Sequence, residues 1–180
     1  MAPPSIILIT GIMASGKSTV AQALAERLPA SVHLRGDIFR RMIVNGQAAI
    51  APPLSDEAEK QLRLRYQLAA GAARRYCQAG FTVVYQDIII GPVLEDVLAW
   101  LGSDYPVYLI VLCPSPEVVA ARETGRDKTG YRDEWTPATL DQGLRETTPR
   151  LGLWLDTSAF SVEQTVGAIL ARLPEAAIIH

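Results

Sequence analysis

The sequence predicts a three-layer α/β fold in which a five-stranded parallel sheet lies between helices. Short apolar runs alternate with helical patterns along the chain, and this alternation is typical of parallel strands joined by crossover helices. One run, Val107–Cys113, is apolar on both faces, as a central parallel strand is. The composition, 49% hydrophobic and 20% charged over 180 residues, is that of one ordinary globular domain. We therefore expect a single domain over residues 1–180.

The first elements alternate strand and helix. Ile6–Thr10 is predicted to be a buried strand, and Ser18–Leu28 a helix, because its apolar residues lie one turn apart. Val32–Arg35 is a short second strand. A second helix is expected to start at Asp37, whose side chain suits an N-cap. Glycine and proline residues then indicate a loop over residues 45–53.

A long helix and a third strand follow. Ser55 is expected to cap a helix that runs to about Gln78, and Gly80 ends it. Thr82–Gln86 is the third strand. The helix residues expected to face the core recur at helical spacing, and they are Leu62, Tyr66, Ala69, Ala73 and Tyr76.

The second half of the chain continues the alternation. Two of its helices begin with a capping hydroxyl followed by proline, and the last begins with a capping box of Ser161 and Gln164. In chain order the elements are a helix over Pro92–Trp100, a strand over Val107–Cys113, helices from Ser115 and from Thr136, a strand over Leu153–Asp156 and a helix after Ser161.

Charge and cysteine usage exclude several protein classes. The net charge of −2 argues against a nucleic-acid binder that works by bulk charge. No apolar run approaches the roughly 18 residues of a membrane-spanning helix. Cys77 and Cys113 lie in apolar patterns and are expected to be reduced core thiols rather than a disulfide framework. With no export signal visible, we expect a cytoplasmic protein that binds neither nucleic acid nor membrane, and the sequence leaves its oligomeric state open.

The strongest functional signal is a phosphate-binding loop. Gly11–Ser18 matches G-x-x-x-x-G-K-[ST] at every fixed position, after a predicted strand and before a predicted helix. Backbone N–H groups of such a loop and the helix N-terminus face phosphates. Lys17 would place a charge on the β- and γ-phosphates, and Ser18 a hydroxyl on Mg²⁺. The expected nucleotide contacts are Gly11, Met13, Ala14, Ser15, Gly16, Lys17, Ser18 and Thr19. The alternative, a glycine-rich turn with an incidental lysine, leaves that lysine at a positive helix end.

Asp37 is a candidate general base. It follows the second predicted strand, and ligands of parallel α/β folds bind beyond the C-terminal ends of strands. A carboxylate there would face the same crevice as Lys17 and accept the proton of an attacking hydroxyl. The alternative is that Asp37 only caps its helix. Arg40 and Arg41 follow, and each either holds an anionic substrate group or is solvated; Arg40 is the stronger candidate for substrate binding.

Two further regions carry candidate site residues. Asp87 follows the third strand, where an acidic residue is expected to contact magnesium, and Gln86 beside it is expected to touch substrate. Arg122 and Arg126 lie on one helix face, at the start of a polar flap expected over residues 126–136. There they would close over nucleotide phosphates. The alternatives are a turn aspartate and a solvated charged face.

These residues together resemble the small kinases typified by chloramphenicol phosphotransferase, within the wider shikimate, gluconate and adenylate kinase group. The resemblance spans almost the whole chain and rests on motifs in matching order. The motifs are Gly11–Ser18, Arg35–Asp37, Gln86–Gly91, Arg122–Arg126 and Asp156–Ser158.

The resemblance implies a P-loop kinase fold and a set of residue roles. Asp37 would be the catalytic base, acting with Lys17 and Arg126. Asp87 would hold magnesium or orient the acceptor. Arg122 and Arg126 would flank the adenine and the phosphates of ATP, and Thr157, in the last motif, would line the adenine end. The region 43–65, which should build the acceptor pocket, has no match to the family, so acceptor identity does not transfer.

The leading hypothesis is therefore an ATP- and Mg²⁺-dependent kinase that phosphorylates a hydroxyl of a small molecule. An antibiotic is the first acceptor class to consider, and a sugar or nucleotide metabolite the second. A base at Asp37 favours a neutral alcohol over a nucleoside monophosphate, whose phosphate oxygen is already anionic. The other class is a regulatory NTPase, which the absence of an N-K-x-D motif disfavours.

Overall fold

The computed structural model describes residues 3–124 and 136–178 and contains the expected parallel sheet. Five parallel strands lie in the order β2-β3-β1-β4-β5, which confirms the predicted fold class. A short β6, which was not predicted, pairs antiparallel with the start of β4. The strands are β1 Ile6–Thr10, β2 Ser31–Arg35, β3 Thr82–Gln86, β4 Val107–Leu112, β5 Leu153–Leu155 and β6 Ala177–Ile178.

The helices lie close to their predicted positions. Ser55 Oγ accepts the N–H of Ala58 at the start of α3, and the predicted capping box of Ser161 and Gln164 is present at the start of α7. The helices are α1 Lys17–Glu26, α2 Asp37–Arg41, α3 Asp56–Gln78, α4 Val93–Leu101, α5 Pro116–Thr124, α6 Pro137–Thr147 and α7 Val162–Ala171, with a 3₁₀ turn over Leu173–Ala176. None of the helices in the described residues has the length and apolar character to cross a bilayer.

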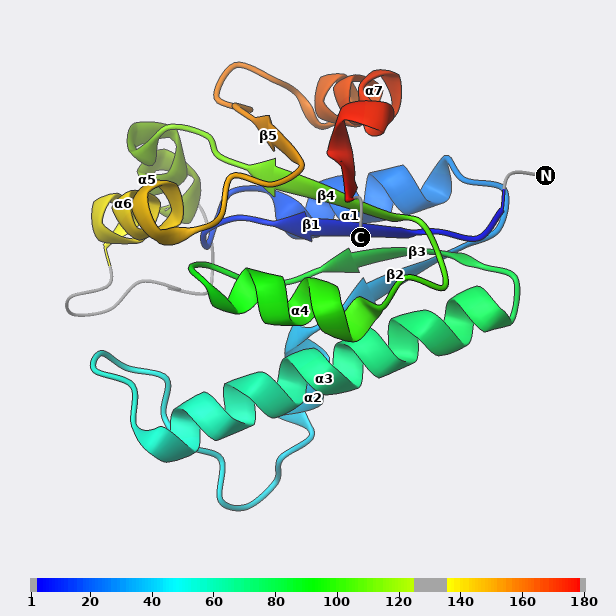
Figure 1. Cartoon of the computed structure of the whole chain (residues 1–180). Helices are drawn as coiled ribbons and strands as arrows, with labels where there is room; N and C mark the ends of the chain where they lie inside the picture. The colour runs from blue at the N-terminus through cyan, green and yellow to red at the C-terminus, as the bar shows by residue number, and fades with distance from the viewer. Residues whose placement is uncertain (1–2, 125–135, 179–180) are drawn as a thin grey trace.

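Helices cover both faces of the sheet, so the fold has three layers (Figure 1). Side chains of β1 alternate between them: Ile6 and Leu8 pack into the core beneath α3 and α4, and Ile7 and Ile9 into the core shared with α1 and α7. Because β1 is the central strand, it is buried on both faces. The chain also reverses direction across the sheet at β1, which places a crevice at its C-terminal end.

Two local predictions are corrected. Asp37 does not cap α2: Gly36 is the N-cap residue, and Asp37 is the first residue of the helix. Tyr76 does not continue the buried stripe of α3, since it is 43% exposed whereas Cys77 is 2% exposed. Cys77 is four residues after the buried Ala73, the spacing that returns to the same helix face. Cys77 and Cys113 are free and buried, as expected.

Candidate functional site

The phosphate-binding loop joins β1 to α1 in a conformation that requires glycine at two places. Gly11 and Gly16 have φ of 149° and 97°, values that other residues rarely adopt. A Cβ on Gly11 would also overlap with the carbonyl oxygen of Leu112 in β4. The loop is thereby held against the neighbouring strand, which fixes the direction in which its N–H groups point.

The start of α1 forms an anion-binding position. Gly16 is the N-cap and provides no side-chain cap, so the first N–H groups of the helix face the cleft described next. Lys17 is 7% exposed, and its Nζ donates to the carbonyl oxygen of Ile12 at 2.6 Å. This bond folds the lysine back over its own loop, where an ammonium group would meet the phosphates of a bound nucleotide.

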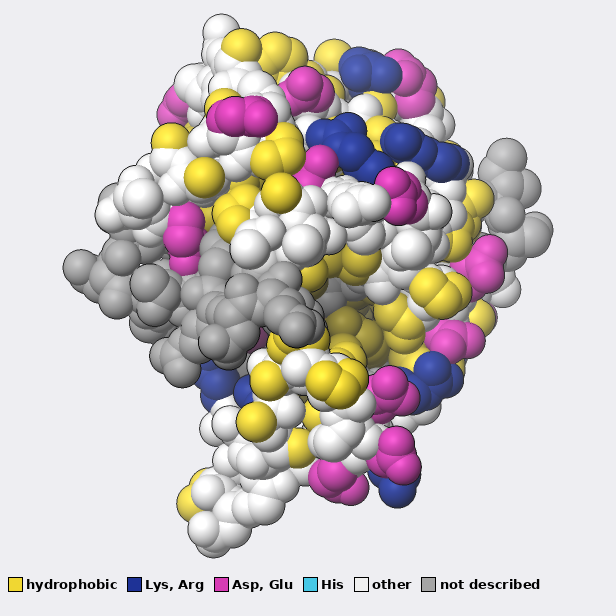
Figure 2. Space-filling view, turned by 90° about the vertical axis from the view of Figure 1, so that its left-hand side faces the viewer, with side chains coloured by type: hydrophobic (Ala, Val, Ile, Leu, Met, Phe, Trp, Pro, Cys, Tyr) yellow, Lys and Arg dark blue, Asp and Glu magenta, His cyan; other side chains and the backbone are white. Residues whose placement is uncertain are grey.

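A cleft of about 580 Å³, the main cleft, opens beside the loop. It lies at the C-terminal end of the strands, the end of the molecule that faces the viewer in Figure 2. Among the predicted residues, the lining includes Met13, Ala14, Gly16, Lys17, Ser18, Thr19, Asp37, Gln86, Asp87 and Arg122. The structure thus brings the predicted base, the loop lysine and the residues after β3 into one space.

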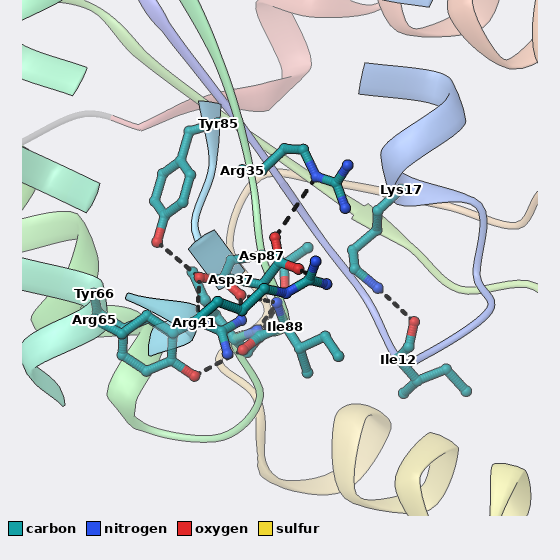
Figure 3. Close-up of polar contacts among 12 residues, drawn as sticks. Ile12, Lys17, Arg35, Asp37, Arg41, Arg65, Tyr66, Tyr85, Asp87 and Ile88 are labelled. Carbon is teal, nitrogen blue, oxygen red and sulfur yellow. Dashed lines mark hydrogen bonds and ion pairs between the residues drawn. The ribbon is translucent and has the colours of Figure 1, made fainter. Parts of the chain in front are cut away.

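Asp37 stands between two arginines. Arg41, one helical turn later, forms an ion pair with Oδ2, and Arg35 Nε lies 3.6 Å from Oδ1 (Figure 3). The Asp37 side chain is 27% exposed and lines the main cleft, while its Oδ1 is buried and accepts no hydrogen bond. A carboxylate held in this way has a fixed direction, which a proton acceptor needs.

Asp87 is buried and fully occupied. Arg65 of α3 binds both of its oxygens, with Nε donating to Oδ2 at 2.9 Å and Nη2 paired with Oδ1. The Tyr85 hydroxyl also donates to Oδ2, at 3.3 Å, and the Ile88 N–H donates to Oδ1 at 2.7 Å. These four donors match the acceptor capacity of a carboxylate. Burial raises the pKa of Tyr85, so its hydroxyl stays a donor at neutral pH.

Two predicted magnesium ligands lie in the main cleft, the hydroxyl of Ser18 and the carboxylate of Asp87, and the carboxylate already accepts four hydrogen bonds. Ser18 is exposed in the main cleft, and its hydroxyl fits a metal that keeps most of its ligands as phosphate and water. Asp87 would have to give up one of its four donors to bind the ion directly, so its predicted magnesium contact stays a prediction. Within residues 3–124 and 136–178, no group of three or more His, Cys, Asp or Glu side chains is placed to hold a metal.

A second groove of about 280 Å³, the side groove, adjoins the loop. Arg122 of α5 forms one wall, donating from Nη1 to the carbonyl oxygen of Ser15 at 3.4 Å and from Nη2 to that of Thr157 at 3.2 Å. The Thr157 Oγ1 is buried and has no hydrogen-bond partner. Phe160 and Val162 add apolar surface. The groove thus combines an apolar wall with a hydroxyl that has no hydrogen-bond partner, and both features suit a planar nucleotide base.

Three predicted site residues do not line either cavity in the part of the chain that the structure describes. Gly11 lies beneath the loop rather than on the surface of either cavity. Arg40 points to the loop after α2, where its guanidinium donates to the carbonyl oxygen of Ala48, so substrate binding by Arg40 stays a prediction. Arg126 and the predicted flap, apart from residue 136, lie outside the described residues.

Three further arginines line the main cleft, and of these the sequence offered only Arg41, as the weaker candidate of its pair. They are Arg35 at the end of β2, Arg41 in α2 and Arg65 in α3. The spacing of Arg41, four residues after Asp37, was a signal that both share a helix face. Arg65 gave no such signal, because it lies in no motif of the chain, and only the packing of α3 under β3 brings it to Asp87.

Solved structures of kinases share this fold. A sugar kinase from Janibacter sp. HTCC2649 is 24% identical, with a TM-score of 0.69 over 97% of this chain and 96% of that one. A tunicamycin resistance protein from Deinococcus radiodurans is 18% identical, with a TM-score of 0.68 over 98% and 99%. The Mycobacterium tuberculosis APS kinase, in complex with AMPPNP and APS, is 16% identical, with a TM-score of 0.66 over 96% and 98%. At these identities the likeness shows the fold, which is that of the P-loop kinases.

Sequence comparison gives a family. No curated protein is a significant match to the chain. The family model AAA_33, described as an AAA domain, matches residues 6–149, which include the phosphate-binding loop, both aspartates and the arginines of the main cleft. Because this match spans well over half of the sequence, the chain belongs to the AAA_33 family of AAA domains.

Proposed function

We propose that the protein transfers the γ-phosphoryl group of ATP to a hydroxyl of a small molecule. One observation carries the proposal: Lys17 and Asp37 line the same cleft, although they come from different strand ends. The phosphate-binding loop alone does not distinguish a kinase from other nucleotide-binding proteins. A carboxylate beside it provides the proton acceptor that an alcohol needs before it attacks phosphorus.

Each part of the site has a role in this proposal. The helix start and Lys17 bind the β- and γ-phosphates, and Ser18 holds Mg²⁺ together with phosphate oxygens. Magnesium supplies charge neutralisation at the transferring group. Adenine occupies the side groove, where Thr157 is the polar contact and Arg122 lies between base and phosphates. The fold shared with a kinase solved in complex with AMPPNP supports nucleotide binding by this chain.

The reaction balances with these groups alone. The acceptor oxygen forms a bond to the γ-phosphorus while the bond from that phosphorus to the β–γ bridging oxygen breaks, and ADP leaves. The proton of the acceptor hydroxyl passes to a carboxylate oxygen of Asp37. Most of the rate enhancement comes from positioning and charge, since phosphoryl transfer needs little covalent chemistry from the protein.

Replacing Asp37 tests the proposal. Asp37→Asn should lower kcat for transfer by roughly 10²–10⁴-fold while the Kd for ATP stays within about twofold, because the loop is untouched. Transfer is followed by mass spectrometry over hydroxylated antibiotics, nucleosides and sugars, and Asp96→Asn on the surface of α4 is the matched control. Phosphoryl transfer at the wild-type rate by Asp37→Asn would show that Asp37 is not the general base. ATP hydrolysis at one slow rate with every acceptor would point instead to a regulatory NTPase.

A further inference from the structure

Three arginines from three different elements face the acceptor side of the main cleft. Arg35 ends β2, Arg41 lies in α2 and Arg65 in α3, and Figure 3 shows them gathered around Asp37 and Asp87. Lys17 comes from the start of α1, and its Nζ points to the carbonyl oxygen of Ile12. Arginine is the side chain that binds carboxylate, sulfate and phosphate groups with two parallel hydrogen bonds.

Arg65 is held rigidly. Its side chain is only 10% exposed, and Asp87 engages Nε and Nη2. Asp87 is itself fixed by Tyr85 and Ile88. The remaining nitrogen, Nη1, is therefore the one available to a ligand in the cleft. A guanidinium that is already ordered loses little side-chain entropy when it binds.

The charges on this side do not cancel. Five cationic side chains and two carboxylates line the main cleft, and MgATP accounts for Lys17 and Arg122. Three arginines then face Asp37 and Asp87, which leaves an excess of positive charge where the acceptor must bind. The positive charge of Arg65 extends to Arg40, since burial, and next the charge of Arg65, lower the pKa of Arg40.

We propose that the acceptor carries an oxyanion group, such as a carboxylate, sulfate or phosphate, in addition to the hydroxyl that is phosphorylated. Arg65 binds this group with Arg41 and Arg35, and the Gln86 amide, 5% exposed in the same cleft, is placed to contact its neutral part. The inference rests on the proposed function, which it narrows to anionic alcohols. In this proposal the role of Asp87 is to position Arg65 for the acceptor rather than to contact magnesium.

A binding experiment separates this inference from catalysis. Protein saturated with Mg·AMPPNP, which fills the phosphate-binding loop, is titrated with sodium sulfate in a calorimeter at ionic strength matched with sodium chloride. We expect one sulfate site, weakened about tenfold in Arg41→Gln. Arg65→Gln combined with Asp87→Asn avoids a buried unpaired carboxylate and should show the same loss. Arg63→Gln, two residues away on the outer surface of α3, is the control and should bind as the wild type does.

Kinetics with matched acceptors complete the test. Each polyol is compared with its acid, sulfate ester or phosphate ester, and KM for the anionic member should be at least about tenfold lower. Absence of sulfate binding to the loaded protein, binding unchanged in both arginine variants, or equal KM for the paired acceptors would overturn the oxyanion site while leaving the kinase proposal intact. Sulfate binding with no transfer to any acceptor would overturn the kinase proposal and leave the anion site standing.

Discussion

At the scale of single residues, the site depends on Gly36, a position where a side chain would overlap with neighbouring residues. Gly36 has an ordinary helical conformation, with φ of −63°, so its backbone alone would accept other residues. A Cβ there would overlap with Oδ2 of Asp87 and touch the ring of Tyr85 at 3.0 Å. The missing side chain therefore lets the start of α2 lie directly on the buried Arg65–Asp87 pair, beneath Asp37.

Gly36→Ala should destabilise the protein by about 1–3 kcal/mol, because the added methyl displaces a buried carboxylate from its donors. Thermal and urea unfolding measure the change. Gly71→Ala is the control: this glycine lies in α3 with nothing within 4 Å of a built Cβ, and the substitution should stabilise by about 0.5–1 kcal/mol through helix propensity. Equal stability of Gly36→Ala and the wild type would show that Asp87 moves freely.

At the scale of elements, α2 and α3 are joined by a loop that one glutamine holds. Gln61 of α3 is 8% exposed; its Nε2 donates to the Gly46 carbonyl oxygen at 2.8 Å, and its Oε1 accepts the Ala48 N–H at 2.9 Å. Arg40 of α2 also donates to Ala48. The loop thereby links the helix that carries Asp37 to the helix that carries Arg65, so it sets their separation.

Gln61→Ala should free residues 42–55 from α3. We expect a loss of about 1–3 kcal/mol in unfolding free energy and faster cleavage of this loop in limited proteolysis, since two backbone groups lose their partner. Gln67→Ala, at an exposed position of the same helix, controls for the change in composition. Cleavage at the wild-type rate in both variants would mean that the loop is held by other contacts.

At the scale of the whole molecule, the strand order assembles the site. β1, β3 and β2 are neighbours with parallel direction, so the loop after residue 10, the turn after residue 35 and the segment after residue 86 end at one edge of the sheet. Ligands that bridge these segments bind only the folded state. Binding must therefore raise stability.

Mg·ATP at about 100 times its Kd should add about 2.7 kcal/mol to the unfolding free energy, which corresponds to roughly 5–10 °C in Tm for a chain of this size. Lys17→Ala should lose most of this shift, and should lose phosphoryl transfer, while keeping the wild-type Tm without nucleotide within a few degrees. Lys60→Ala, on the exposed side of α3, is the control. A full nucleotide shift in Lys17→Ala would contradict the assignment of the phosphate-binding loop.

The sequence by itself determined the five parallel strands, most helix ends and the phosphate-binding loop. These depend on local chemistry: apolar periodicity, Ser55 as a cap, and a loop motif whose residues are adjacent in the chain. Asp37 and Asp87 were also found in this way, because Asp87 directly follows a strand and Asp37 lies two residues after one. Only the tertiary structure decided that Gly36, not Asp37, caps α2, and that Arg41 rather than Arg40 lines the cleft.

The partner of Asp87 was beyond reach from the sequence for a physical reason. Arg65 lies 22 residues before it, and their contact depends on how α3 packs beneath β3. That packing is set by the summed contacts of many core residues, none of which resembles a motif. The sequence therefore determined which residues carry the chemistry of phosphate binding, and the tertiary structure decided which charges surround the acceptor.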